Sequence, residues 1–383
     1  MTIRLLNPED DRYERLKLIR WWDQEKLHNA QVLVLGAGAL GNEVLKNLAL
    51  LGAGSVYVAD FDAIETTNLT RSALFRQTDV GKPKAQVAAE RASEINPDCR
   101  VHALELDVRF GLGLGFISKI DLIFGCVDNR EARYYVNRSC YLLKKLFLDG
   151  GLDTLNGSVS VFHAPETPCY ECTLTRVDRA ELQKRISCLK SQDPEIKQHV
   201  PTAPTTAAII AGLQVQIGIR ALHGLHIPEG KRIGMYGLSD VFFEIKLEKS
   251  EDCGLHSATD PLPESLHTLD ALETDPLASV LAIAKQRWKA DSLIWDFDRD
   301  LIVTLQCTSC GTRKEFVGTF GQFGGSDQCS CGGAFKPQIA IEYTGKEEWG
   351  NKSFRELGFP ADHIYCAQTP EGRIYFRLNR RNI

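Results

Sequence analysis

The chain has 383 residues, and since single hydrophobic cores stop growing at shorter lengths, we expect two or three domains. Hydrophobic residues make up 43% and charged residues 25% of the sequence, which excludes a disordered or fibrous protein. The formal net charge of -5 argues against nucleic acid as the main partner, because a polyanion attracts a basic surface.

The N-terminal segment and the longest apolar stretch both argue against export and membrane insertion. Residues 1–28 mix acidic and basic side chains and lack the apolar core of a secretory signal, so we interpret them as a helical arm. The apolar stretch 207–225 contains Gln214, Gln216 and Arg220, which are costly in lipid and fit a buried helix better. We therefore expect a cytoplasmic protein without membrane contact.

Strand-like apolar runs alternate with helical patterns through the first half of the chain. The runs lie at 31–35, 56–59 and 121–124. Their alternation with helices predicts an α/β domain built on a mostly parallel, Rossmann-like sheet. We assign this domain to residues 29–258.

A glycine-rich turn follows the first of these strands and opens a helix. Gly36, Gly38 and Gly41 have the spacing GxGxxG, which lets backbone amides and a helix N-terminus receive a phosphate. Asp60, at the end of the next strand, fits an acceptor for ribose hydroxyls. By themselves these residues fit a nicotinamide cofactor as well as a nucleotide substrate.

Further charged residues follow in an order that hydride transfer does not need. Asp62, Asn68, Arg71 and Lys84 come after the second strand, and Asp128 stands in Val-Asp-Asn at the end of a later strand. Arg71 and Lys84 can neutralise a triphosphate, and Asp128 can hold Mg²⁺. This set predicts a site for ATP and Mg²⁺, whereas solvated surface charges are the alternative.

The order of these motifs, with Arg12-Tyr-Glu-Arg15 before them and Asn96-Pro97 between them, resembles the E1/ThiF/MoeB superfamily over residues 10 to 250. The resemblance implies ATP-dependent adenylation of a protein carboxylate. It also implies that Arg15 reaches into the active site of a second subunit, and hence a homodimer. The residues that it implies for ATP and metal binding are Gly36, Gly38, Gly41, Asp60, Asp62, Asn68, Arg71, Lys84 and Asp128.

Two groups of closely spaced ligand residues predict structural zinc sites. Cys169 and Cys172 have the spacing of a zinc knuckle, and Cys253 and His256 can complete a closed Cys₃His site. The family resemblance places a zinc site at the same two positions, although CxxC is the usual second pair. The alternative is that Cys253 is incidental.

A second group, Cys307, Cys310, Cys329 and Cys331, is of the zinc-ribbon kind. Four thiolates around Zn²⁺ would stabilise a small domain with a thin core. The alternative is four thiols that do not meet in the fold.

Cys188 is the candidate nucleophile. It lies in a polar crossover segment at about 173–204, between the first knuckle and Pro201-Thr-Ala-Pro. In compact single-chain E1 enzymes, which this chain resembles, the cysteine that forms a thioester occupies this segment. Lys184, Arg185 and Lys190 would favour a thiolate there, and an ordinary loop cysteine is the alternative.

The last part of the chain predicts a separate small domain. A segment at 259–274, rich in Pro, Asp, Ser and Thr, is interpreted as a linker. Residues 275–383 follow, with a predicted helix at 277–288 and strands at 301–305 and 374–378. They resemble the ubiquitin-fold domain with which E1 enzymes recruit an E2, carrying a zinc-ribbon insertion. A generic small α+β domain is the alternative.

The leading hypothesis is a compact E1 that adenylates a ubiquitin-like protein, forms a thioester on Cys188 and transfers the modifier to an E2. The second hypothesis is a sulfur-carrier-protein adenylyltransferase of the ThiF/MoeB type. A nicotinamide-dependent oxidoreductase or a non-catalytic nucleotide-binding scaffold is a third possibility. It would leave Arg71, Lys84 and Asp128 without a role.

Overall fold

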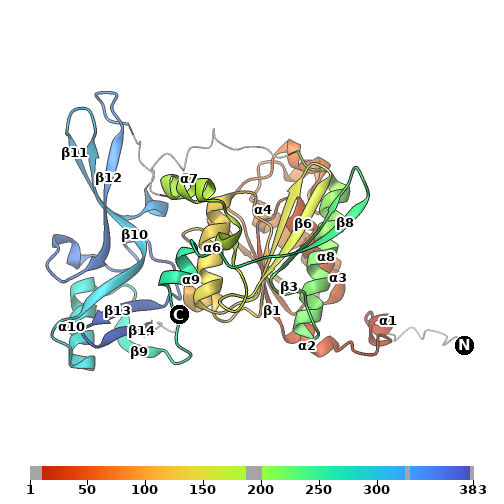
Figure 1. The fold of residues 1–383 in the computed structure, drawn as a ribbon, viewed down its shortest axis with the longest axis horizontal. Helices are drawn as coiled ribbons and strands as arrows, with labels where there is room; N and C mark the ends of the chain where they lie inside the picture. Colours follow the sequence, from red (N-terminus) through yellow and green to blue (C-terminus); the bar gives the residue numbers. More distant parts are fainter. Residues whose placement is uncertain (1–10, 187–200, 324–327, 380–383) are drawn as a thin grey trace, which may run out of the picture.

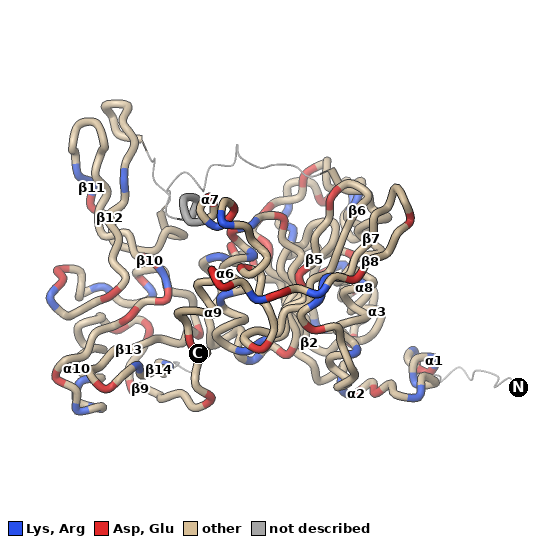
Figure 2. The backbone as a smooth tube through the Cα atoms, viewed as in Figure 1, with Lys and Arg blue, Asp and Glu red and all other residues tan. Residues whose placement is uncertain are grey.

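The computed structural model describes residues 11–186, 201–323 and 328–379. The chain forms a larger α/β part and a smaller part that lies beside it (Figure 1). Lys and Arg are interspersed with Asp and Glu along both parts (Figure 2), as the small net charge of the sequence leads one to expect.

The larger part is organised by an eight-stranded sheet in the order β3-β2-β1-β4-β5-β6-β7-β8. Strands β1 to β5 pair in parallel, and β6 to β8 continue the sheet with antiparallel pairs. The mostly parallel, Rossmann-like sheet is therefore confirmed. The strands are β1 (Gln31–Leu35), β2 (Ser55–Ala59), β3 (Arg100–Leu104), β4 (Leu122–Gly125), β5 (Phe147–Asp153), β6 (Asn156–Phe162), β7 (Lys231–Tyr236) and β8 (Val241–Lys246).

Strand β1 is apolar on both faces because helices cover both faces of the sheet. Val32 and Val34 belong to one buried cluster, and Leu33 and Leu35 belong to another on the opposite face. This two-sided burial is typical of parallel sheets and explains the continuous Val/Leu run. The helices are α3 (Ala39–Leu51), α4 (Lys84–Ile95), α5 (Leu114–Ile117), α6 (Arg130–Leu142), α7 (Arg176–Ile186), α8 (Pro204–Leu222) and α9 (Gly254–Ala258).

Helix α8 is the predicted buried helix. Its length and composition would also let a helix cross a membrane, but here it packs against α3 and strands β5 and β6. The polar side chain of Gln214 fits in this buried position because its amide group is hydrogen-bonded. Its Nε2 donates to the carbonyl oxygens of Gly125 and Leu148 at 3.0 and 2.8 Å.

From residue 11 on, the predicted helical arm contains two short helices, α1 (Glu14–Lys17) and α2 (Gln24–Asn29). Asp23 begins the second helix as its N-cap. The arm is tied to the domain at Tyr13, whose hydroxyl accepts a hydrogen bond from Asn96. A second tie is the backbone N–H of Asp23, which donates to His223 Nε2 at 3.0 Å.

The smaller part is built on a second sheet in the order β11-β10-β13-β14-β9, with β12 also paired to β10. Helix α10 (Leu277–Trp288) has the predicted bounds and packs on the core of this sheet. The strands are β9 (His267–Leu272), β10 (Ile294–Cys307), β11 (Arg313–Thr319), β12 (Phe335–Tyr343), β13 (Tyr365–Thr369) and β14 (Gly372–Asn379). Single 3₁₀ turns are Thr66–Thr70, Gln77–Asp79, Tyr170–Thr173, Phe320–Gln322 and Glu348–Asn351.

Strand β9 lies inside the segment that the composition predicts to be a linker. It pairs in parallel with β14, so that Leu269 lies opposite Leu378. Alternating polar residues in β9 remain exposed while Leu269 and Ala271 are buried. A strand with one exposed face has a polar composition like that of a linker, which explains the difference.

The two parts share an interface. The backbone N–H of Leu114 donates to His363 Nδ1 at 3.2 Å, and Lys119 forms an ion pair of 2.7 Å with Asp362. A small apolar cluster of Leu114, Leu142, Leu262 and Ile364 joins residues of both parts. Polar and apolar contacts together therefore position the second domain on α5 and α6.

We expect Gln214→Leu to lower the free energy of unfolding by about 2 to 3 kcal/mol, because two buried carbonyl groups lose their donor. The change can be followed as a lower midpoint in urea denaturation. Gln216→Leu is the matched control, since Gln216 lies on the same helix but is exposed. Equal midpoints for the two variants would contradict this role of Gln214.

Candidate active site and metal centres

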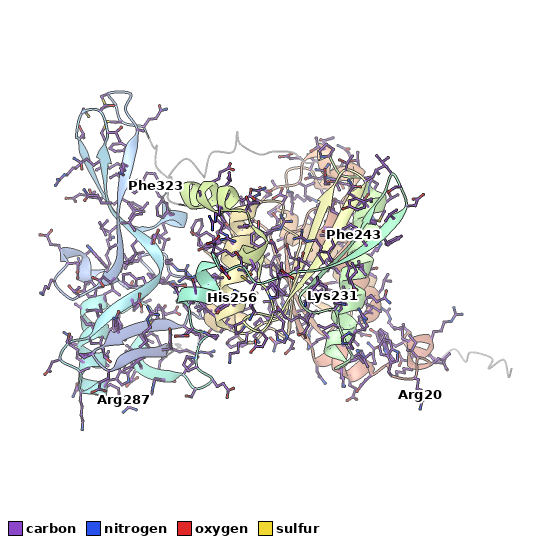
Figure 3. The ribbon with its side chains drawn as sticks, in the orientation of Figure 1. Arg20, Lys231, Phe243, His256, Arg287 and Phe323 are labelled. Carbon is purple, nitrogen blue, oxygen red and sulfur yellow. The ribbon has the colours of Figure 1, made fainter. Side chains whose placement is uncertain are left out.

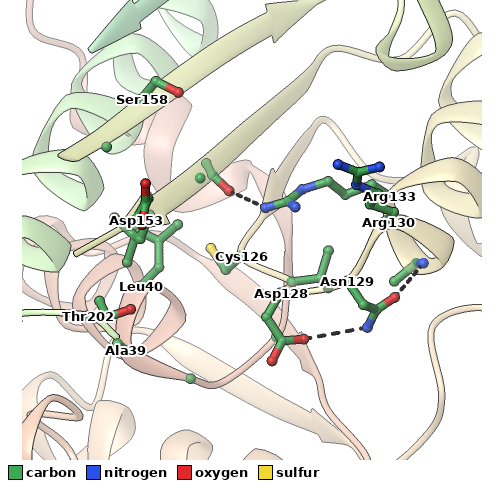
Figure 4. Close-up of a pocket in the computed structure, with 18 of the residues that line it drawn as sticks. Ala39, Leu40, Cys126, Asp128, Asn129, Arg130, Arg133, Asp153, Ser158 and Thr202 are labelled. Atoms are coloured by element: carbon green, nitrogen blue, oxygen red, sulfur yellow. Dashed lines mark hydrogen bonds between the residues drawn. The ribbon is translucent and has the colours of Figure 1, made fainter. Parts of the chain in front are cut away.

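A pocket of about 800 Å³ lies at the carboxyl ends of β1, β2, β4 and β5, part of which is shown in Figure 4. The strand order changes direction at β1, which has β2 on one side and β4 on the other. Ligands bind at such switch points in open α/β sheets. The predicted residues that line the pocket are Gly36, Gly38, Asp60, Asp62, Asn68, Arg71, Lys84 and Asp128.

The glycine turn between β1 and α3 needs glycine for two different reasons. Gly36 has φ +94°, and a Cβ there would come within 2.6 Å of the Cys126 carbonyl oxygen. Gly41 does not line the pocket. It lies in α3 against the Gly36 backbone, where a side chain would collide. Gly36 therefore shapes the floor of the pocket, while Gly41 allows the helix to approach the turn.

Asp60 holds this turn with both of its carboxylate oxygens. Oδ2 accepts a hydrogen bond of 2.7 Å from the Ala37 N–H, and Oδ1 accepts one of 2.8 Å from the Asp62 N–H. Burial raises the pKa of Asp60, and the Lys84 ammonium and these N–H groups oppose that rise. Asp60 thus positions the phosphate-binding turn in addition to any contact with ribose.

The predicted phosphate-binding residues are held by the segment between β2 and α4. Lys84 Nζ forms an ion pair of 3.0 Å with Asp62. Arg71 Nη1 donates to the Thr67 carbonyl at 2.8 Å, and Asn68 Oδ1 accepts from the backbone N–H of Glu65 at 2.9 Å. The structure therefore brings both cations to one pocket although they are 13 positions apart in the sequence.

Asp128 and Asn129 follow β4 on the other side of the pocket. Asn129 Oδ1 caps α6 through the Ala132 N–H at 2.7 Å, while its Nδ2 lies 3.5 Å from Asp128 Oδ1 (Figure 4). The Asp128 carboxylate is a hard oxygen ligand of the kind that Mg²⁺ prefers. Its place beside the pocket fits the predicted metal role.

Helix α6 contributes two cations that the sequence analysis did not identify. Arg130 and Arg133 both line the pocket. Arg133 Nε forms an ion pair of 3.0 Å with Asp149, and its Nη2 donates to the Gly150 carbonyl (Figure 4). Burial raises the pKa of Asp149, and the Arg133 guanidinium opposes that rise. The sequence contains one signal that could have identified them: the two arginines follow Val-Asp-Asn with a spacing of i, i+3, which places them on the same face of a helix.

The pocket continues along the antiparallel half of the sheet. Small residues from β5 and β6 line this extension, among them Gly150, Gly151 and Gly157, and Phe243 of β8 borders it (Figure 3). A Cβ at Gly157 would come within 2.5 Å of the buried Ile210, so this glycine allows β6 to pack closely against α8. Glycine backbone thus lines the extension that leads to the nucleotide end.

The remaining predicted residues are Arg15 and Cys188, and the structure adds Cys126 to the lining of the pocket. Arg15 is on α1, near the N-terminal end of the molecule (Figure 1), and does not line the pocket. Cys188 lies outside the described residues. Cys126 lines the pocket, but burial raises the pKa of its thiol well above the usual value. The Cys126 side chain is therefore a poor thiolate nucleophile.

The predicted Cys₃His residues converge. Sγ of Cys169 lies 3.8 Å from that of Cys172 and 3.7 Å from that of Cys253, and His256 Nδ1 lies 3.3 to 3.8 Å from all three. A tetrahedron with Zn–S bonds of about 2.3 Å has edges of about 3.8 Å. His256 Nε2 lies 3.2 Å from the Thr167 carbonyl oxygen, an interaction that leaves Nδ1 as the metal ligand.

The four predicted ribbon cysteines also meet. Cys307 and Cys331 lie 3.5 Å apart, and Cys310 and Cys329 lie 3.7 Å apart. All four sulfur atoms are within 4.8 Å of one another. They come from the ends of β10, β11 and β12, which form a finger that projects from the second domain (Figure 1). Both clusters have four ligand atoms and fit closed zinc sites.

With this geometry in place, comparisons with known proteins identify the family. The ThiF family model matches residues 11–255. The chain belongs to the ThiF family. The matched region contains the glycine turn, the nucleotide pocket and the Cys169 cluster up to Cys253, whereas the second domain follows it.

Two curated relatives are adenylyltransferases. The molybdopterin-synthase adenylyltransferase of Escherichia coli is 30% identical over 63% of this chain and 94% of its own length. The sulfur carrier protein adenylyltransferase of Thermus thermophilus is 38% identical over 44% of this chain, and the match covers 66% of that protein. SUMO- and NEDD8-activating enzyme subunits of Caenorhabditis elegans are also relatives, matched over 26% and 43% of their lengths.

The fold is similar to that of E. coli MccB crystallised with ATP. The two structures align with a TM-score of 0.53 and 25% sequence identity, over 65% of this chain and 75% of MccB. The family match and the fold comparison therefore confirm the E1/ThiF/MoeB resemblance. Each covers about two thirds of the chain, so roles specific to the second domain need a separate argument.

Zinc analysis of the purified chain should give about two zinc ions per molecule. Cys253→Ser and Cys329→Ser should each lose about one ion, because three ligands bind zinc much more weakly than a closed set of four. Cys366→Ser is the matched control, since Cys366 lies in neither cluster. Unchanged zinc content in both ligand variants, measured by mass spectrometry, would contradict the assignment.

Proposed function

We propose that this protein uses ATP and Mg²⁺ to adenylate the C-terminal carboxylate of a small protein with a ubiquitin-like fold. The observation that carries the proposal is a single pocket that combines the glycine turn, Arg71, Lys84 and Asp128 with an extension lined by glycines. The nucleotide fits one end, and a chain terminus fits the other. Membership of the ThiF family supports the same chemistry.

Adenylation makes a carboxylate reactive because it attaches a good leaving group. A carboxylate oxygen of the substrate attacks the α-phosphorus of ATP, and the bond from that phosphorus to the β-phosphate oxygen breaks. Pyrophosphate leaves, and an acyl-adenylate remains. Arg71 and Lys84 stabilise the negative charge that develops on the phosphates. Asp128 would hold Mg²⁺, which would supply further positive charge for the same purpose.

The finer proposal is an E1 activity with a thioester step on Cys188. The Cys188 thiolate would attack the carbonyl carbon of the acyl-adenylate, form a thioester and release AMP. Helix α7, which enters the crossover segment, is anchored beside the pocket by the ion pair of Asp178 with Arg130. Transfer to an E2 docked on the second domain would follow. The relatives that are SUMO- and NEDD8-activating subunits support this proposal.

A sulfur-carrier adenylyltransferase is the second candidate. It is favoured by the E. coli molybdopterin-synthase adenylyltransferase, because this chain covers 94% of that relative. The enzyme would then stop at the acyl-adenylate. The second domain, which lies beyond the family match, is the feature that favours the E1 proposal over this one.

Arg15 would complete the active site of a second copy of the chain, which makes the proposed enzyme a homodimer. In this structure α1 lies at the end of the larger part that is remote from the second domain (Figure 1). Exposed Leu18, Ile19 and Trp21 beside it give the arm an apolar surface for such a contact.

Lys84→Met should weaken ATP binding at least about tenfold, because a charge-assisted bond to phosphate contributes about 1.5 to 3 kcal/mol. Isothermal titration with ATP and Mg²⁺ measures the change. Lys82→Met is the control, since Lys82 is exposed, pairs with Asp79 and does not line the pocket. Binding of NADH in place of ATP by the unmodified chain would reject adenylation.

Incubation with ATP, Mg²⁺ and a ubiquitin-like protein ending in Gly-Gly should give an adduct that reductant removes. Cys188→Ala should abolish the adduct and leave pyrophosphate release within about threefold, because adenylation precedes thiol attack. Cys366→Ala is the matched control and should retain the adduct, because Cys366 lies neither in the nucleotide pocket nor in a cysteine cluster. Pyrophosphate release without any adduct in the unmodified protein would instead support the sulfur-carrier candidate.

A further inference from the structure

A second cavity, of about 230 Å³, lies between the two domains. Its walls come from α6 and the segment 258–262 on one side, and from β10, β13, β14 and the loop before β13 on the other. A water molecule takes about 30 Å³ in the liquid, so the space exceeds that of a single trapped water. It is smaller than the nucleotide pocket and suits a small organic ligand.

One wall of the cavity is the polar face of the second sheet. Asp296, Cys366 and Tyr375 are neighbours across β10, β13 and β14 in the strand register. Arg373 forms an ion pair of 3.2 Å with Asp296. The opposite faces of these strands carry the aromatic core of the domain, and some residues of that core, among them Trp295 and Tyr365, border the cavity as well. The sheet therefore places a row of polar groups at the cavity between the two domains.

Two polar groups of the cavity already have partners. Asp298 forms an ion pair of 3.1 Å with Arg299, and its Oδ1 lies 3.2 Å from His363 Nε2. Because His363 Nδ1 accepts the Leu114 N–H, Nε2 is the nitrogen that donates to Asp298. Neither group offers a free charge to a ligand.

Arg138 of α6 is different. Its guanidinium forms no ion pair within the described part of the chain, and its buried Nε has no acceptor there. Burial raises the pKa of Asp300, and Arg138 opposes that rise through space. A guanidinium that lines an interdomain cavity without a carboxylate in direct contact, among the described residues, leaves N–H donors that a ligand can use.

Two more donors without acceptors belong to residues of this cavity. Trp295 Nε1 and the Tyr365 hydroxyl have no hydrogen-bond partner among the described residues. Both residues are more than nine-tenths buried. Buried polar atoms are almost always paired, and unpaired ones point to a missing water, ion or ligand. All three unpaired groups can donate, so the missing partner is an acceptor.

We propose that the interdomain cavity binds a small organic carboxylate, with Arg138 as its counter-ion. The unpaired donors exclude a metal cation, and the cavity volume excludes a nucleotide. Phe297, Phe354 and Phe359 also line the space, which favours a ligand with an apolar body over a bare inorganic anion. The proposal does not depend on the adenylation chemistry, because none of these residues lines the nucleotide pocket.

Such a ligand would contact both domains at once. Arg138 belongs to the α/β domain, whereas Trp295, Tyr365 and Arg373 belong to the second domain. A compound that binds only when the two faces are together stabilises the docked arrangement by mass action. Occupancy of the cavity would therefore fix the position of the second domain relative to the nucleotide pocket.

The test is isothermal titration of the full chain with sodium benzoate at constant ionic strength, with sodium phosphate as a parallel arm. We expect one benzoate per chain with a dissociation constant of about 1 mM or lower. Arg138→Leu should weaken binding at least about tenfold, and Arg138→Lys should retain part of it, because the charge remains. Arg100→Leu, at an exposed arginine of β3, should bind as the unmodified chain does.

Lys84→Met separates this cavity from the nucleotide pocket, and benzoate binding should be unchanged in that variant. If Arg138→Leu does not fold by circular dichroism, Arg138→Gln serves the same purpose with a polar replacement of similar length. Absence of saturable benzoate binding would mean that the cavity holds water only and would overturn the proposal. Equal binding by the Arg138 variants, or tighter Arg138-dependent binding of phosphate, would overturn it as well.

Discussion

The nucleotide pocket depends on one partly buried carboxylate, Asp60, which joins the ends of two neighbouring parallel strands. It accepts N–H groups from Ala37 and Asp62, so the turn after β1 and the segment after β2 keep a fixed relative position. Burial of this carboxylate is unfavourable by itself, and Lys84 offsets part of that effect. Lys84 therefore supports the pocket electrostatically in addition to its proposed role at the phosphates, and its ion pair with Asp62 contributes to the geometry of the site.

The Cys₃His cluster extends this rigid scaffold to the start of the crossover segment. It joins Cys169 to Cys253, which are 84 positions apart, and so closes a long loop around α7 and α8. Arg179 of α7 donates to the Leu174 carbonyl and to Ser250, three residues before the cluster resumes at Cys253. A metal in this cluster would therefore fix both the entrance of the crossover and the end of the α/β domain. That location explains why a closed, non-catalytic site is useful beside an adenylation pocket.

The contact between the domains is more polar than either core. A continuous hydrogen-bonded path runs from α5 into the second sheet through Leu114, His363 and Asp298. Because each buried donor needs its acceptor, a polar interface of this kind permits only a few orientations of one domain relative to the other. The unpaired groups around Arg138 are the place where this arrangement is incomplete. The proposed ligand in the interdomain cavity would couple the orientation of the second domain to the binding of a small molecule. This coupling gives a physical reason for a polar cavity at the domain boundary.

The sequence by itself determined the features that depend on short spacings. The glycine turn, the two-sided apolar run of β1, the bounds of α10 and the cysteine pairs are local patterns whose geometry follows from the chain periodicity. The tertiary structure decided the features that need strands or helices from distant segments. These are the Arg133–Asp149 pair, the extension of the nucleotide pocket along the antiparallel half of the sheet, the pairing of β9 inside a segment of linker-like composition, and the cavity around Arg138. These depend on strand order and register, and a single sequence contains no local signal for which distant residues become neighbours.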